Sequence, residues 1–251
     1  MIEIFILSLI QGVTEFLPIS SSSHLIIASE FFELEKSLSI DVSLHIGSFI
    51  AVVAYFYKDI FNFFENRKLF IKIIISSIPV ILIGYVLVRT NFIEEIRNIK
   101  VIAWMTIVFG ILLYISDRFK LKKEIKYNFD FKAALIIGFF QAISLIPGVS
   151  RSGITITAAR LLNFKRFDSA KISFLLSIPT LAAVSIYGLS NIFTQEDLGF
   201  SIINLFSIFI SFLFSFFTIK FFLGYIQKFN LNLIIIYRII LGLVLLYFAY
   251  L

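Results

Sequence analysis

The sequence predicts an all-α polytopic membrane protein made of two inverted-topology repeats. Three observations support this prediction. The 251 residues are 59% hydrophobic and only 15% charged, whereas a soluble domain carries roughly a quarter charged residues. Several apolar runs reach the ~20 residues needed to cross a bilayer. The order of long and short apolar runs in the first half of the chain recurs in the second half, which indicates an internal repeat.

Six apolar runs are long enough to span a bilayer, and four are shorter. The long runs cover residues 40–57, 70–88, 100–116, 172–190, 201–219 and 232–250. The short runs form two pairs, broken at Pro18 and Pro147, and cover residues 2–16, 22–32, 132–146 and 152–163. Runs of this length suit re-entrant segments better than spans. We therefore expect each repeat to be a re-entrant helical hairpin followed by three transmembrane helices.

We expect a single integral membrane domain over residues 1–251, with repeat one at about 1–120 and repeat two at about 127–251. Three spans per repeat is an odd number, so the repeats should have opposite orientations. Lys and Arg gather in cytoplasmic loops, and sixteen of the 22 lie in four segments that this topology puts on one side: 58–72, 117–132, 160–171 and 220–228. Four lie on the other side. Both termini should then be outside, with one hairpin entering from each face.

Composition also excludes some classes of protein and site. The chain contains no cysteine, so a disulfide framework or a thiolate metal site is excluded. The net charge of +6 is explained by basic cytoplasmic loops. We therefore expect membrane lipids, and no nucleic acid, as partners.

The break in the first pair, which we call the first seam, reads QGVTEFLPISSSSHL (residues 11–25). Gln11 and Glu15 are four residues apart, so they share one helix face, and their oxygens could hold Mg²⁺ or Ca²⁺. Four serines then form the turn and the next helix start, where hydroxyl groups cap free N–H groups or donate to an anion. His24 follows within one turn and can exchange a proton near neutral pH.

The break in the second pair, the second seam, reads QAISLIPGVSRSGIT (residues 141–155). Aligned on the two prolines, Ser21 pairs with Ser150 and Ser22 with Arg151. Arg151 offers a fixed fork of donors that matches phosphate oxygens. Helix N-termini at both seams favour anions. The candidate phosphate-binding residues are Ser20, Ser22, Ser23, Gly148, Ser150, Ser152 and Thr155.

Phosphoryl transfer requires a cation site, a hydroxyl, an acid–base group and an anion-binding arginine together.

Simpler roles exist for several other polar residues. His24 could be structural, and Gln141 is explained by hairpin packing. Asp41 and His45 could be an interfacial pair or belong to the site. Arg238 is expected to extend to the inner surface.

The two seams resemble the signature motifs of the undecaprenyl-diphosphatase family, the bacterial polyprenyl-pyrophosphate phosphatases linked to bacitracin resistance. Residues 41–59 and 173–180 are also similar to family segments. The resemblance covers essentially the whole chain. It implies hydrolysis of undecaprenyl diphosphate to undecaprenyl phosphate and phosphate, which recycles the lipid carrier for cell-wall synthesis. It also implies a divalent metal ion and a multi-pass protein of the bacterial plasma membrane, with its site facing the outer side.

The resemblance further assigns roles by position. Glu15 corresponds to a motif acid, Ser21 to the serine proposed as nucleophile, His24 to the motif histidine and Arg151 to the phosphate-binding arginine. Gln11 stands where the family has Glu or Gln, so this position cannot act as a base. Ser23 stands where a glycine is common.

A different class of protein also fits the predicted topology. Inverted repeats with broken helices are the architecture of secondary transporters, so an anion transporter or a lipid-phosphate flippase is the alternative. Glu15 and His24 would then couple transport to proton movement. The sequence leaves open which metal is used, whether attack by Ser21 is covalent, and whether the chain forms a homodimer.

Overall fold

The computed structural model of the chain describes all residues except 33–36, 66, 91, 120–121 and 195–200. The described residues are almost entirely helical, and Lys123 and Phe164 form an isolated bridge. The helices in chain order are α1 (Ile2–Thr14), α2 (Ser21–Phe31), α3 (Leu38–Tyr55), α4 (Tyr57–Glu65), α5 (Arg67–Arg89), α6 (Phe92–Ile96), α7 (Ile99–Asp117), α8 (Ile125–Asn128), α9 (Phe131–Ala142), the 3-10 turn η1 (Ile143–Leu145), α10 (Arg151–Leu161), α11 (Arg166–Thr194), α12 (Ile202–Lys228) and α13 (Asn232–Tyr250).

Six helices are long and apolar enough to cross a membrane: α3, α5, α7, α11, α12 and α13. They coincide with the six long runs, so the predicted spans are confirmed and the chain is a multi-pass membrane protein. The helices α11 and α12 exceed the predicted spans most, with 29 and 27 residues. The four short runs form α1, α2, α9 and α10, each of 11 to 13 residues. Lys36 and Lys120, counted in the charge comparison, lie outside the described residues.

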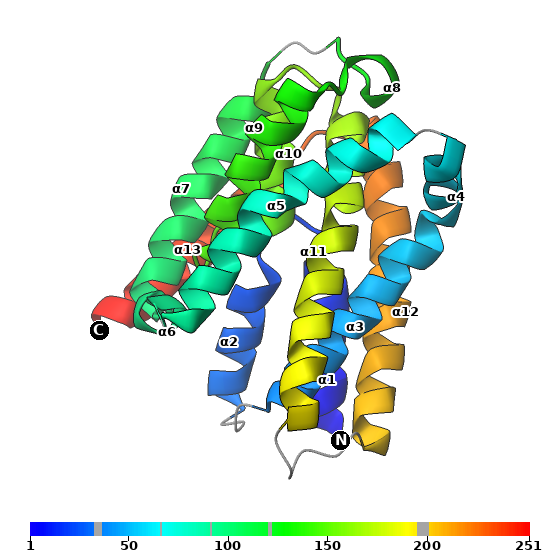
Figure 1. Cartoon of the computed structure of the whole chain (residues 1–251). Coiled ribbons are helices and arrows are strands. Elements are labelled where there is room, and N and C mark those ends of the chain that lie inside the picture. The colour runs from blue at the N-terminus through cyan, green and yellow to red at the C-terminus, as the bar shows by residue number, and fades with distance from the viewer. Residues whose placement is uncertain (33–36, 66, 91, 120–121, 195–200) are drawn as a thin grey trace.

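The two ends of the molecule carry different connections (Figure 1). Both termini, α6 and the start of α3 lie toward one end, which we call the α6 end. The short helices α4 and α8 lie toward the other end, which we call the α8 end. The start of α1 is at the α6 end, whereas α9 begins near α8. The two pairs of short helices therefore enter the molecule from opposite ends.

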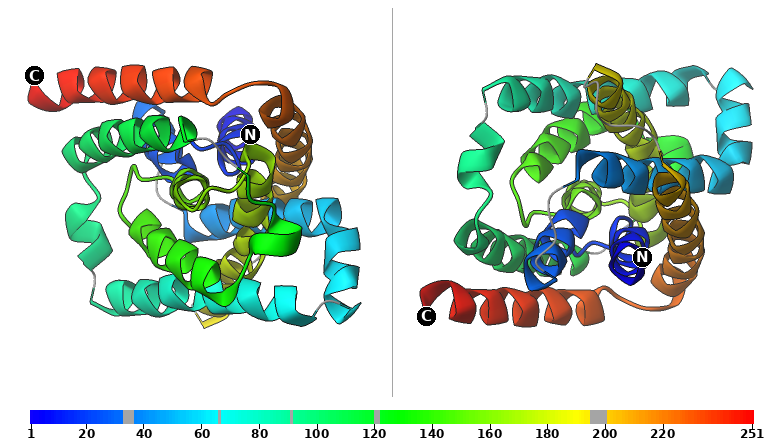
Figure 2. Two further views of the ribbon diagram at one scale, coloured as in Figure 1. Left: turned by 90° about the horizontal axis from the view of Figure 1, so that it is seen from above. Right: turned by 90° about the horizontal axis from the view of Figure 1, so that it is seen from below.

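The short helix α10 lies in the middle of the molecule, surrounded by other helices when viewed along its axis (Figure 2). Every residue from Ser152 to Arg160 is buried. A helix that is buried on all sides has no polar face to expose, and this helix uses its polar atoms inside the protein. The Thr157 hydroxyl, for example, donates to the Gly153 carbonyl at 2.8 Å. Burial of α10 fixes the second seam, whose last residues form the start of this helix.

Small residues let α3 and α12 pack closely. A Cβ atom added to Gly47 would lie 2.4 Å from the carbonyl oxygen of Ile208. Across the same interface, the Ser48 hydroxyl lies 3.0 Å from that of Ser215, and the Ser211 hydroxyl donates to the Leu44 carbonyl at 2.7 Å. Close approach at small residues, joined by interhelical hydrogen bonds, is typical of helix association in a bilayer.

We predict that Gly47→Ala destabilises the protein. The added methyl group has no space at the α3–α12 contact, and overpacking of this kind costs about 1–3 kcal/mol. The measurement is unfolding in mixed detergent micelles. Gly224→Ala is the matched control, because a Cβ atom at this α12 position would contact nothing within 4 Å. Equal stability of the two variants would contradict the close packing described above.

Candidate functional site

The two seams meet inside the molecule. The Arg151 guanidinium donates to the Glu15 carboxylate, with Nη2 and Oε1 separated by 2.9 Å. The Ser152 hydroxyl donates to the Leu17 carbonyl at 2.8 Å. The predicted proximity of Glu15 and Arg151 is therefore confirmed, although 136 positions separate them in the sequence. Their chemical roles stay predictions.

Each seam has the same unusual backbone at the start of its second helix. Ser20 and Ser150 are the N-cap residues of α2 and α10, with φ of 75° and 67°. A positive φ is uncommon for residues other than glycine. Aligned on these caps, Ser21 corresponds to Arg151, one position away from the alignment on prolines. The two alignments differ because two residues lie between Pro147 and the N-cap Ser150, whereas one residue lies between Pro18 and the N-cap Ser20.

The carboxylate of Glu15 is the centre of the polar contacts. Its Oε2 atom accepts a 2.6 Å hydrogen bond from the Ser21 hydroxyl and a 3.1 Å bond from the Gln11 amide. A nucleophile and its base are found at such distances, within about 2.6–3.2 Å. Phe16, which follows Glu15, packs edge-to-face on Phe174 of α11 with ring centroids 5.3 Å apart. This packing holds the end of the first hairpin against α11.

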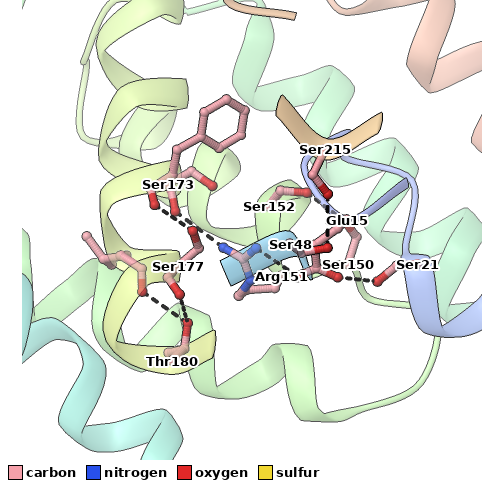
Figure 3. A network of polar contacts seen from close by, with 12 residues as sticks. Glu15, Ser21, Ser48, Ser150, Arg151, Ser152, Ser173, Ser177, Thr180 and Ser215 are labelled. Atoms are coloured by element: carbon pink, nitrogen blue, oxygen red, sulfur yellow. Dashed lines mark hydrogen bonds and ion pairs between the residues drawn. The ribbon is translucent and has the colours of Figure 1, made fainter. Parts of the chain in front are cut away.

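Arg151 is held from two sides (Figure 3). Its Nη1 atom donates to the Ser173 carbonyl of α11 at 3.3 Å, while Nη2 donates to Glu15. The Ser173 hydroxyl in turn accepts a 2.7 Å hydrogen bond from Thr155, one turn along α10. The guanidinium has further N–H groups, so it can bind a ligand without losing its position.

A cavity of about 450 Å³ lies beside these groups, within the size range of small-molecule sites. Its polar lining includes Glu15, Ser20, Ser21, Ser22, Ser144, Ser150, Arg151 and Thr180, together with His45 and Arg97. Apolar side chains complete the lining, among them Ile26, Leu181 and Val184. No sequence motif marks Arg97 as part of this site, and the role of His45 was open from the sequence alone. A larger hollow of about 830 Å³ lies at the α8 end, where Asp117 pairs with Arg160 and Arg166. It shares no lining residue with the cavity beside Glu15.

Three predicted phosphate-binding hydroxyls are used inside the protein. Ser23 bonds with Ser20 at 2.8 Å, while Ser152 and Thr155 are committed to Leu17 and Ser173. Gly148 does not line the cavity either. It has φ of 94°, and a Cβ atom there would lie 2.5 Å from the Ile102 carbonyl oxygen of α7. These residues support the seams, and among the predicted phosphate ligands Ser20, Ser22 and Ser150 line the cavity.

His24 faces α13. Its Nδ1 atom donates to the Ser20 carbonyl at 2.7 Å, because a carbonyl oxygen only accepts, and its Nε2 atom lies 2.6 Å from the Tyr237 hydroxyl. The neutral ring then accepts a hydrogen bond from Tyr237. His24 is not among the lining residues of the cavity. In this arrangement it holds the strained Ser20 cap, and its predicted role in proton transfer is untested.

The prediction that Arg238 extends to the inner surface is wrong. The side chain is completely buried, and it joins both seams. Its Nη1 atom donates to the Pro18 carbonyl at 3.0 Å and to the Val149 carbonyl at 3.3 Å. Its Nη2 atom donates to the Gly148 carbonyl at 3.0 Å, and its Nε atom donates to the Thr106 carbonyl at 3.2 Å. The unwound turns expose carbonyls at this depth, so the guanidinium finds partners without reaching water. The sequence signal that could have indicated this structural role of Arg238 is the presence of an ionisable residue inside an apolar span.

The residues near Glu15 fit a divalent cation only in part. The described residues contain no cluster of three or more His, Cys, Asp or Glu side chains that could hold a metal. However, the Oε1 atom of Gln11 is buried without a hydrogen-bond partner. Rotation of that amide by half a turn would direct its oxygen, in place of its nitrogen, toward Glu15. Two such oxygens suit Mg²⁺, which is commonly held by one or two carboxylates, waters and substrate phosphates.

Fold and site together define a class: a polytopic membrane protein with an acid, a hydroxyl and an arginine gathered in a cavity among its spans. The description of the family whose sequence model matches residues 4–244 is "Bacitracin resistance protein BacA". The chain belongs to this family, and the names of the relatives described next make it a membrane-bound phosphatase.

Similar proteins match over nearly their whole lengths. An undecaprenyl-diphosphatase of Pelagibacter ubique (strain HTCC1062) is 52% identical, covering 99% of this chain and 98% of the relative. An undecaprenyl-diphosphatase of Saccharophagus degradans is 41% identical, covering 94% of this chain and 93% of the relative. One of Jannaschia sp. (strain CCS1) is 35% identical over 98% of both chains.

We predict that Arg238→Met destabilises the joined seams. Methionine has a similar length but no donor, so the carbonyls of Pro18, Gly148 and Val149 lose their partner. A buried acceptor left without its donor costs about 1–3 kcal/mol, and several carbonyls lose their donor together. The measurement is unfolding in mixed detergent micelles. Arg89→Met, at the exposed end of α5, should change stability little, and an equally small effect of Arg238→Met would refute its role in joining the seams.

Proposed function

We propose that the chain hydrolyses undecaprenyl diphosphate to undecaprenyl phosphate and inorganic phosphate. The observation that carries this proposal is the contact of Ser21 and Arg151 with one carboxylate, Glu15, beside a cavity in a membrane protein. The names of relatives up to 52% identical support the substrate. The proposal includes the recycling of the lipid carrier and bacitracin resistance in the bacterial plasma membrane.

In the proposed reaction, the Ser21 oxygen attacks the terminal phosphorus while its proton passes to Glu15. A bond forms between Ser21 and phosphorus, and the bridging P–O bond breaks with its electron pair leaving on the prenyl phosphate. Water then releases inorganic phosphate from Ser21. Arg151 neutralises charge that develops on the transferred phosphoryl group, where preorganised donors contribute most. Direct attack by a water molecule oriented by Ser21 is the other route.

The proposal assigns Gln11 and Glu15 as the residues that would hold a divalent cation, Mg²⁺ or Ca²⁺. Such an ion would supply further charge neutralisation. The unpartnered Gln11 oxygen supports this assignment. Because Glu15 also contacts Ser21 and Arg151, its two oxygens would orient the nucleophile, the arginine and the ion together.

The proposed topology has two inverted repeats, each beginning with a re-entrant hairpin, and the α6 end facing outside. The opposite entry of the two hairpins and the excess of basic residues in the segments at the α8 end support it. Arg97 lines the cavity and lies in the connection between α6 and α7 at the α6 end. This position supports access to the site from the outer side.

The test of the proposed function is release of phosphate from a prenyl diphosphate by the purified protein in detergent. We expect release that stops when a chelator removes divalent ions and resumes when Mg²⁺ or Ca²⁺ is added. Arg151→Ala should lower turnover by roughly 100-fold or more, the scale for loss of one oxyanion donor. Arg89→Ala is the control for loss of a positive charge.

Two outcomes would contradict the proposal. Turnover of Arg151→Ala within about threefold of the parent, or roughly 0.7 kcal/mol in barrier, would remove Arg151 from the reaction. Absence of phosphate release in detergent, combined with prenyl phosphate movement across vesicles, would favour the transporter or flippase alternative, since detergent provides no transmembrane gradient.

We also predict that Ser21→Ala abolishes a trappable phosphoserine. If Ser21 is the nucleophile, rapid acid quenching with a labelled terminal phosphate should yield a phosphopeptide that contains Ser21. Ser29→Ala, on the same helix α2, should leave that peptide intact. Full activity in Ser21→Ala would exclude covalent attack and leave only the route through water.

A further inference from the structure

The larger hollow at the α8 end, which we call the basic hollow, has a strongly positive lining. Its volume is about 830 Å³, and its walls come from the ends of α7, α10 and α12 and the starts of α11 and α13. The charged residues of this lining, among the described residues, are basic Arg118, Arg160, Lys165 and Arg166 and acidic Asp117. The basic hollow is a second charged region, which the proposed reaction does not use.

Two arginines of the basic hollow share a single buried carboxylate. Nη2 of Arg160 lies 3.0 Å from Oδ1 of Asp117, and Nε of Arg166 lies 2.8 Å from the same oxygen. Nη2 of Arg166 also donates to Oδ2 at 3.0 Å. The side chains of Arg160 and Asp117 are only 1% and 4% exposed. One carboxylate between two guanidinium groups leaves one positive charge, and buried charges need compensation.

Nearby acidic residues do not supply this compensation. Glu124 pairs with Lys165, so that pair is neutral. Asp168 does not line the basic hollow, and its Oδ1 atom accepts a 3.0 Å hydrogen bond from the Ile125 amide. The carboxylates of Asp117 and Glu124 thus neutralise two of the four basic residues. The described part of the chain leaves the lining with a net positive charge.

Arg118 carries part of this charge at the exposed rim of the basic hollow. Its guanidinium lies 4.3 Å from the centre of the Tyr114 ring and donates to the Tyr114 hydroxyl. Tyr114 is neutral, so the contact positions the arginine without cancelling its charge. An anion at the rim would therefore meet a guanidinium that is already held in place.

Arg160 also has an unused donor. Its Nη1 and Nη2 atoms donate to the carbonyls of Phe164 and Asp117 at 3.3 and 2.6 Å. Its Nε atom is buried and has no hydrogen-bond partner among the described residues. Buried polar groups are almost always paired, and an exception calls for an ion or a water molecule. The buried end of the basic hollow is therefore incomplete in both charge and hydrogen bonding.

Two long helices begin at the basic hollow. Arg166 is the first residue of α11 and Asn232 is the first residue of α13, and both line the hollow. A helix N-terminus carries partial positive charge and free N–H groups, which suit a phosphate. Gln227 and Asn230 add side-chain amides to the same lining. Helix starts, amides and guanidinium groups are all donors that phosphate oxygens accept.

We propose that the basic hollow binds a phosphate group, either free or carried by the headgroup of an anionic phospholipid. The phosphate would accept hydrogen bonds from Arg118 and Arg166 and would supply the negative charge that Arg160 and Arg166 lack. In the proposed topology the α8 end faces the inner side, where basic pockets between membrane helices bind lipid headgroups. This site is separate from the cavity beside Glu15 and does not depend on the proposed reaction.

The test is titration calorimetry of the purified protein in detergent with inorganic phosphate at constant ionic strength. Arg166→Gln removes one positive charge, and Gln227→Glu adds a negative charge at an exposed position of the basic hollow. We expect each variant to weaken one binding event by about tenfold or more, the scale of one hydrogen bond to a charged group. Gln227→Glu breaks no ion pair, so it decides the result if Arg166→Gln does not fold.

Two control variants make the same charge changes outside the basic hollow. Arg67→Gln lies at the start of α5 and Asn128→Asp lies on α8, both at exposed positions. Each should change the affinity for phosphate less than about twofold. Phosphate that binds beside Glu15 would be affected equally by the variants and the controls, so it does not disturb the comparison.

A second probe, dihexanoylphosphatidylglycerol, distinguishes the two sources of the phosphate group. Weakened binding of this lipid alone in Arg166→Gln and Gln227→Glu would assign the basic hollow to a lipid headgroup. Weakened binding of inorganic phosphate would show that a free phosphate also binds. Equal affinities of the variants and controls for both probes would overturn the proposal, and so would failure of the parent protein to bind either probe.

Discussion

The structure depends on how the unwound backbone of two broken helices is satisfied inside a membrane protein. Irregular backbone survives at that depth only where protein or a wet cavity provides partners. Arg238 meets this need by donating to carbonyls of Pro18, Gly148 and Val149, which belong to both seams. Ser152 adds a bond to Leu17. One buried guanidinium therefore makes the two hairpins a single unit, and the site forms where they meet.

Joining the seams also decides which residues can react together. Ser20 and Ser150 have positive φ, and this backbone presents Ser21 and Arg151 as the first residues of two short helices. Both side chains then bond to the Glu15 carboxylate. The strain at each cap is supported by surrounding bonds, including the one from His24 to Ser20. Such preorganisation suits a reaction in which positioning and electrostatics supply most of the catalysis.

The cavity is completed by parts of the chain that carry no motif. Helix α3 contributes His45, the α6–α7 connection contributes Arg97, and α11 contributes Thr180 and apolar side chains. These elements complete the lining of the cavity beside the ion pair of Glu15 and Arg151. Close packing of α3 on α12, which small residues permit, in turn sets where His45 lies.

The sequence by itself determined the features that depend on local composition. The lengths of the apolar runs identified all six spans, because a bilayer demands about 20 apolar residues, and the seams identified Glu15, Ser21 and Arg151. Only the tertiary structure decided which polar residue meets which. Arg238 and Pro18 are 220 positions apart, and Tyr237 lies 213 positions from His24. No local pattern specifies such contacts, since they depend on how helices α1, α10 and α13 pack around one another. The same packing engages the hydroxyls of Ser23, Ser152 and Thr155 in hydrogen bonds inside the protein, and it brought Arg97 to the cavity.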